Sequence, residues 1–91
     1  SALRDLFELG LMDVCRLVVE DYAAAAIGSV PIPPEDRAVI IRFYQCECFG
    51  QVMAWLNDGM RYDIGKQFRR LCYLGEGMTE RMLRRAMETD T

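Results

Sequence analysis

The chain has 91 residues, enough for one domain, and it carries a formal net charge of −3 with Lys66 as its single lysine. A surface that binds nucleic-acid phosphates is usually basic, so this balance argues against direct DNA contact by the chain itself. Hydrophobic residues make up 52% and charged residues 27%, a balance that excludes a disordered chain. We find no apolar run of the ~18 residues that a membrane span requires and no basic, apolar leader. We therefore expect a cytoplasmic protein with no membrane partner.

The first predicted element is an amphipathic helix that ends before Gly28, a residue suited to the left-handed stop conformation. Gly10 weakens the middle of this helix by about 1 kcal/mol relative to alanine, so the helix can kink or break there. The small residues Ala23 to Ala26 allow a neighbouring helix to approach closely. The apolar residues recur at three- and four-residue steps, and this stripe consists of Leu3, Phe7, Leu11, Val14, Val18, Tyr22 and Ala25.

A proline-rich loop, residues 29–34, separates this helix from a second one. Proline cannot continue a helix because it lacks the N–H and restricts the residue before it. Pro34 suits the first helical position, and the two acidic residues after it favour the positive end of the helix dipole. We predict a helix that runs from Pro34 to Asn57 or Asp58 and stops at Gly59.

Apolar side chains surround most of the second half of this helix, which is typical of a helix buried on more than one side. A 91-residue chain seldom has enough core to cover such an element completely, so we expect a partner to cover part of it. The residues concerned are Phe43, Tyr44, Cys46, Cys48, Phe49, Val52, Met53, Trp55 and Leu56.

Asp63 is placed to cap a third helix. Its apolar seam consists of Ile64, Phe68, Leu71, Cys72, Gly75, Met78, Met82, Leu83 and Ala86. Gly75 and Gly77 interrupt the pattern, but Gly75 falls on the seam, where a small residue permits tight helix contact. We therefore predict one continuous helix. With no convincing strand in the sequence, the expected fold is all-α, a bundle of three main helices.

One segment carries a family resemblance. The order FYxxxxxGxxxxWLxDGM, followed by a Tyr-Asp helix start and an apolar FxxLC run, resembles the end of the regulatory domain in TetR-type (tetracycline-repressor-like) transcriptional regulators. The matching residues are Phe43, Tyr44, Gly50, Trp55, Leu56, Asp58, Gly59, Met60, Phe68 and Leu71. The resemblance covers about a third of the chain well.

The resemblance implies that residues 1–91 form a single C-terminal effector and dimerisation domain. Because the chain opens with Ser1 already in helical rhythm, we expect a fragment whose helix-turn-helix DNA-binding domain lies upstream. DNA would be contacted only through that missing domain.

In the resembling family, the last two helices of two subunits pack as a four-helix bundle. A homodimer of this kind would set the spacing of two DNA-binding domains on a two-fold symmetric operator. We place the dimer interface at Phe49, Gly50, Val52, Met53, Leu56, Phe68, Leu71, Cys72, Gly75 and Met82.

We predict a cavity between the first two helices that binds a small apolar or aromatic effector. The effector would change DNA binding because it binds one state of the dimer more tightly than the other. The lining of the cavity would be Phe7, Val14, Val18, Tyr22, Phe43 and Glu47. The chain ahead of Asp36 is short for the family, so a domain that only dimerises, with no effector, is the alternative.

The four cysteines, Cys15, Cys46, Cys48 and Cys72, lie in apolar helical contexts, and we interpret them as buried, reduced thiols. Side chains two residues apart on a helix point about 200° apart, so Cys46 and Cys48 cannot readily share a metal. The chain has no histidine. We predict no metal and no cofactor.

The sequence has no glycine-rich phosphate loop and no nucleophile elbow, so we predict that it is not an enzyme. Two alternatives stay open. A small dimeric helical enzyme of the chorismate-mutase type would need Arg4, Arg16, Arg42 and Lys66 to converge on a dianion. A plain protein-interaction module would bind a different partner more tightly than itself.

Overall fold

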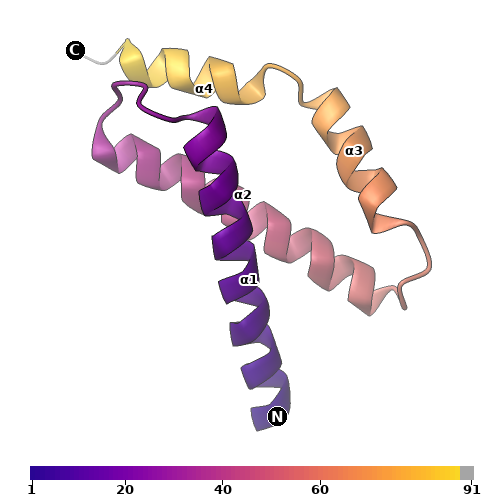
Figure 1. The fold of residues 1–91 in the computed structure, drawn as a ribbon. Helices are drawn as coiled ribbons and strands as arrows, with labels where there is room; N and C mark the ends of the chain where they lie inside the picture. Colours follow the sequence, from indigo (N-terminus) through magenta and orange to yellow (C-terminus); the bar gives the residue numbers. More distant parts are fainter. Residues whose placement is uncertain (89–91) are drawn as a thin grey trace.

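The computed structural model describes residues 1–88, and the described residues form helices α1 (Ala2–Ala26), α2 (Pro34–Asn57), α3 (Ile64–Leu74) and α4 (Met78–Met87). No strand occurs in this part of the chain, and the predicted all-α class is confirmed. Helices α1 and α2 lie side by side and cross, α3 follows the far end of α2, and α4 returns toward the loop between α1 and α2 (Figure 1).

The contact between α1 and α2 is built on small side chains. Cys15, Val19 and Ala23 recur every fourth residue of α1 and are all buried. Rows at this spacing form the ridges by which two helices commonly interdigitate. Ile40 of α2 is buried opposite the end of this row, and Leu83 of α4 closes the same cluster. The core therefore sits where α1, α2 and α4 meet.

The larger residues of the predicted α1 stripe do not form this contact. Leu3, Phe7, Val14 and Val18 are all more than half exposed. These four residues of the stripe are therefore not the ones by which α1 packs on α2. The physical reason is size, because short side chains let the two backbones approach, and a row of Phe and Leu would hold them apart.

The helix ends follow the local signals in the sequence. Gly28 (φ 55°) and Gly59 (φ 77°) adopt the left-handed conformation just beyond α1 and α2, as predicted. Pro34 begins α2, and the side chain of Asp63 accepts a hydrogen bond from the Lys66 backbone N–H at 3.0 Å. Helix α1 runs through Gly10 without a break.

The third predicted helix is divided in two, so the prediction of one continuous helix is wrong. Helix α3 ends at Leu74, and Gly77 adopts φ 87° immediately before α4 begins. A left-handed residue cannot belong to a right-handed helix, and glycine adopts this conformation without the steric cost of a side chain. The chain consequently changes direction between α3 and α4 (Figure 1).

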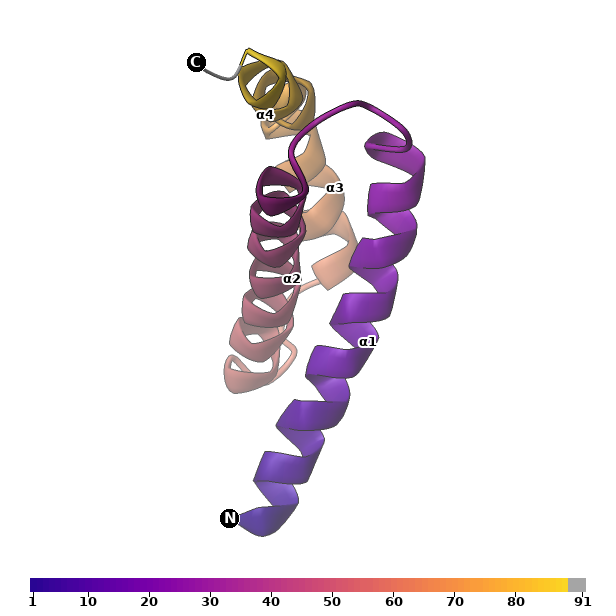
Figure 2. The same ribbon diagram turned by 90° about the vertical axis from the view of Figure 1, so that its left-hand side faces the viewer.

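The arrangement is elongated. Its radius of gyration is 15.2 Å, against about 12 Å for a compact domain of this length. Its accessible surface is 6692 Å², whereas a compact monomer of this size would expose roughly 5,400 Å². The first turns of α1 extend beyond the neighbouring end of α2 (Figure 2). Over residues 1–88, no helix is both long and apolar enough to cross a membrane.

Candidate functional site

Eight of the ten predicted interface residues lie on α2 and α3, and we call them the α2–α3 face: Phe49, Gly50, Val52, Met53, Leu56, Phe68, Leu71 and Cys72. The apolar members on α2 are half-buried, Gly50 is exposed, and Leu71 and Cys72 on α3 are exposed. Within the described chain, not one member of the face is fully covered. A side chain added at Gly50 would meet no described atom of its own chain within 4 Å. This face therefore has room for another molecule.

Helix α3 is the part of this face that the rest of the chain covers least. Ile64, Phe68 and Leu71 follow one side of the helix at the spacing of an amphipathic stripe, with Lys66 and Arg70 on other sides. None of the described residues of α3 is buried. An amphipathic helix normally gains its stability by burying the apolar stripe, so α3 lacks the contact that would stabilise it.

Gly75 and Met82 lie outside α2 and α3. Gly75 is in the turn after α3, where an added Cβ would come within 3.2 Å of the Leu71 carbonyl oxygen. Met82 packs against the core cluster of its own chain. The change of direction at Gly77 separates Met82 from the seam on α3.

Local hydrogen bonds fix α3 relative to α2. The indole Nε1 of Trp55 donates to the Tyr62 carbonyl oxygen at 2.8 Å across the turn. Farther along, Gln67 Nε2 donates to Gln51 Oε1 at 3.1 Å, and Gln51 Nε2 donates to Glu47 Oε1 at 2.9 Å. Glu47 is therefore held by a glutamine one turn along α2. Gln51 and Gln67 also line a hollow of about 250 Å³ together with Arg70, Leu71 and Leu74.

The six residues predicted for an effector pocket lie on α1 and α2. Phe7, Val14, Val18, Tyr22 and Phe43 are between 44% and 57% exposed, and Glu47 is half-buried. The structure brings two of them, Tyr22 and Phe43, against Tyr44, with ring centroids 5.4 and 5.2 Å from its own. Phe7 and Val14 lie nearer the N-terminal end of α1, away from this aromatic group.

A buried threonine completes the aromatic group. The hydroxyls of Tyr22 and Tyr44 each share a hydrogen bond with the Thr79 hydroxyl, at O–O distances of 2.9 and 2.5 Å. Thr79 is 7% exposed and joins the first turn of α4 to α1 through Tyr22 and to α2 through Tyr44. Burial raises the pKa of Tyr44 against the opposing effect of the Thr79 hydrogen bond, so the phenol is neutral at physiological pH. Sequence reasoning missed Thr79, because no local signal links a threonine to partners 35 and 57 residues away.

A shallow groove of about 400 Å³ lies between the start of α2 and α4, and sequence reasoning missed this groove too. It is lined by Asp36, Val39, Ile40, Arg81, Met82, Arg85 and Ala86. None of the six predicted pocket residues is among these lining residues. The groove exists because α4 returns across the start of α2, a tertiary contact that the assumed continuous helix would not have made.

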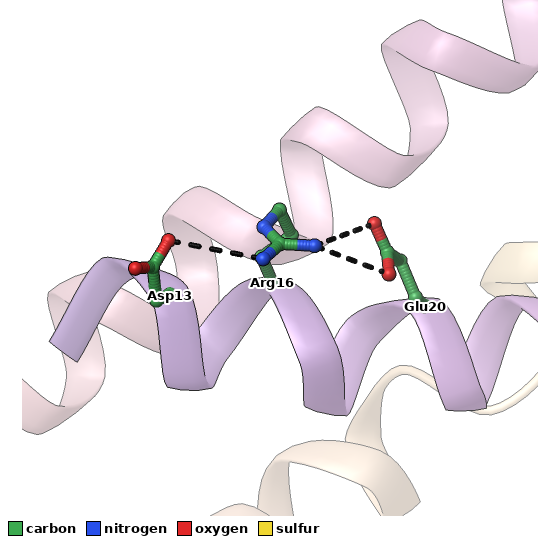
Figure 3. Close-up of polar contacts among 3 residues, drawn as sticks. All are labelled: Asp13, Arg16 and Glu20. Carbon is green, nitrogen blue, oxygen red and sulfur yellow. Dashed lines mark hydrogen bonds and ion pairs between the residues drawn. The ribbon is translucent and has the colours of Figure 1, made fainter. Parts of the chain in front are cut away.

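The charged residues of α1 form surface pairs. Arg16 lies between Asp13 and Glu20, with nitrogen–oxygen distances of 3.9 and 3.3 Å (Figure 3). Arg4 pairs with Glu8 at 3.0 Å. Such pairs on an exposed helix contribute only about 0.2–0.5 kcal/mol each. Arg4 and Arg16 are separated by about 18 Å along the helix axis, so these two cations do not converge on one dianion.

The thiols differ in their surroundings. Cys15 is buried and Cys48 is half-buried, whereas Cys46 and Cys72 are exposed. The expectation that all four are buried is therefore wrong for Cys46 and Cys72. Across residues 1–88, no group of three or more histidine, cysteine, aspartate or glutamate residues is placed to hold a metal ion.

Comparison with known proteins gives one assignment. Residues 1–77 match the model of a family described as the transcriptional regulator C-terminal region, of TetR type. No curated protein and no solved structure matches the chain significantly. The match spans α1, α2 and α3, which include the segment that resembles this family and the whole α2–α3 face. The chain therefore belongs to the family of C-terminal regions of TetR-type transcriptional regulators.

Proposed function

We propose that this regulator domain forms a homodimer by packing the α2–α3 face of one copy against the same face of a second copy. Helices α2 and α3 of both subunits would then build a four-helix bundle. The observation that carries the proposal is α3, an amphipathic helix with no buried residue in the described chain. A two-fold axis through this face would bury the same stripe in both subunits.

The exposed area supports the proposal. The chain exposes 6692 Å², which is roughly 1,300 Å² more than a compact monomer of its size would. A stable dimer of standard size buries about 800 Å² per partner. The excess is therefore large enough for one such interface. Leu71, Tyr73 and Leu74 on α3 are among the exposed large hydrophobic residues, and others lie on α1.

The proposed role in transcription follows from dimerisation. Two subunits held by a rigid bundle would fix the distance between two DNA-binding domains on a symmetric operator. Those DNA-binding domains would have to lie elsewhere in the protein, because this chain has a net charge of −3. Family membership supports this regulatory role over catalysis.

Sedimentation equilibrium of the 91-residue chain tests the dimer. We expect twice the chain mass at micromolar concentration. Gly50→Leu should shift the mass toward the monomer, because its side chain would occupy the space that a partner helix needs. A folded wild-type monomer at these concentrations would reject the proposal.

Gly10→Leu is the matched control for Gly50→Leu. A side chain at Gly10 likewise meets no atom of the described chain within 4 Å, and Gly10 lies on α1 outside the α2–α3 face. Both substitutions remove a glycine from a helix interior, which stabilises a helix by up to about 1 kcal/mol. Gly10→Leu should therefore keep the dimer. Equal loss of dimer in both variants would show that Gly50 does not lie in the dimer interface.

We further propose that a small apolar or aromatic effector binds between α1 and α2, against the aromatic group at Tyr22, Phe43 and Tyr44. The supporting observation is that the exposed rings of Tyr22 and Phe43 pack against Tyr44, beside the hydroxyl of Thr79, and ligand sites typically combine apolar rings with a few polar groups. A bound effector should raise the melting temperature of the domain, because it binds the folded state. In a thermal-shift screen, a hit that Phe43→Ala abolishes would support this site. A screen of aromatic compounds without any hit would favour a domain that only dimerises.

A further inference from the structure

Two cysteines meet where α1 and α2 pack. Cys15 belongs to the buried row on α1 and is 1% exposed. Cys48 follows Ile40 and Tyr44 at four-residue steps on α2, so all three lie on the side of the helix that faces α1. Cys48 is also the neighbouring group that, after burial, contributes to the raised pKa of the Cys15 thiol, as expected for two side chains on facing sides of the α1–α2 contact. The α1–α2 contact therefore places one cysteine of each helix on its facing sides.

The two thiols differ in reactivity. Burial, followed by the adjacent Cys48 thiol, raises the pKa of Cys15 to about 12. Cys15 is consequently a protonated thiol at neutral pH and a poor first nucleophile. Cys48 is half-buried and can be reached by a small molecule from solvent. Cys48 is thus the member of the pair that an oxidant meets first.

We propose that Cys15 and Cys48 form an oxidation-sensitive pair that closes to a disulfide between α1 and α2 in the presence of hydrogen peroxide. The Cys48 thiolate attacks one peroxide oxygen, the O–O bond breaks, and the departing hydroxide takes up a proton to become water. Cys48 is then a sulfenic acid. The Cys15 sulfur attacks the Cys48 sulfur, the S–O bond breaks, and the hydroxyl group leaves with the Cys15 proton as a second water. Two thiols lose two electrons, and the peroxide gains them.

The exposed thiols are not placed to compete for Cys15. Cys46 is two residues from Cys48, so its side chain points away from the side that contacts α1. Cys72 lies on α3, which contributes nothing to the buried core cluster. The selectivity of the pair therefore comes from helix packing, whereas exposure alone would select Cys46 and Cys72.

The test uses the full 91-residue chain carrying Cys46→Ser and Cys72→Ser, which leaves the pair as its only thiols. After treatment with hydrogen peroxide, the intact mass should fall by about 2 Da, the loss of two hydrogens. Peptide mapping should link Cys15 to Cys48 within one chain. The melting temperature should rise, because a cross-link restricts the unfolded state, and it should return when a reductant is added.

Single variants in the same background separate the two roles. Cys48→Ala should not react with peroxide. Its Cys15 thiol should therefore still be alkylated once the treated protein has been unfolded. Cys15→Ala should instead leave a Cys48 sulfenic acid that a cyclic diketone traps. Retention of two free thiols after prolonged peroxide treatment would overturn the proposal, and so would links that form only between chains.

Discussion

Leu71→Glu should weaken the proposed dimer by at least about a hundredfold, since it would place an unpaired carboxylate in the apolar interface at a cost of several kcal/mol. The isolated subunit should tolerate the same change, because Leu71 is already 40% exposed. Sedimentation equilibrium should show a monomer at concentrations where the wild type is a dimer. Far-ultraviolet circular dichroism should show that helix content remains.

Leu9→Glu provides the control for this variant. Leu9 is 65% exposed on α1 and lies outside the α2–α3 face, so the added charge should stay in water. The control should remain dimeric. If Leu71→Glu keeps the dimer mass, the second copy binds another face. If both variants are monomers, the added charge disrupts the dimer wherever it is placed, and the α2–α3 face is not specifically involved.

Leu83→Ala should lower the free energy of unfolding by about 2–5 kcal/mol, the usual cost of removing a buried leucine side chain. Leu83 is 6% exposed and brings α4 into the cluster with Ala23, Ile27 and Ile40. Small domains have only about 5–15 kcal/mol of stability in total, so the loss should be evident as a lower urea midpoint.

Met87→Ala on the same helix is the comparison. Met87 is 48% exposed, so its truncation should cost well under half as much as that of Leu83. Similar costs for the two variants would mean that α4 is not docked through Leu83 as the structure shows.

The sequence predicted those features that depend on neighbouring residues. Pro34 set the start of α2, Gly28 and Gly59 marked the ends of two helices, and Asp63 marked the start of α3. Each of these residues acts on its own backbone, through a fixed φ, a left-handed conformation or a side-chain cap. Helix bounds were accordingly accurate over α1 and α2.

Features that depend on tertiary contacts were not predictable in the same way. Counting apolar residues on α1 favoured the stripe with Phe7 and Val14, whereas packing selected Cys15 and Ala23 for their small size. The division between α3 and α4 depended on Gly77, which a helix tolerates at a cost of about 1 kcal/mol and a turn accepts freely. The partners of Thr79 required the fold itself. Of the candidate site, the sequence predicted the α2–α3 face by its excess of apolar side chains, and it gave no sign of the groove between the start of α2 and α4.

The turn at Gly77 divides the C-terminal part of the chain into two pieces with different attachments. Helix α4 is secured to its own subunit through Thr79 and Leu83, while α3 has no buried residue. A dimer built on the α2–α3 face, as we propose, would therefore leave α4 outside its interface, so a substitution in the packing around Leu83 should weaken each subunit without altering the surface that joins the two copies.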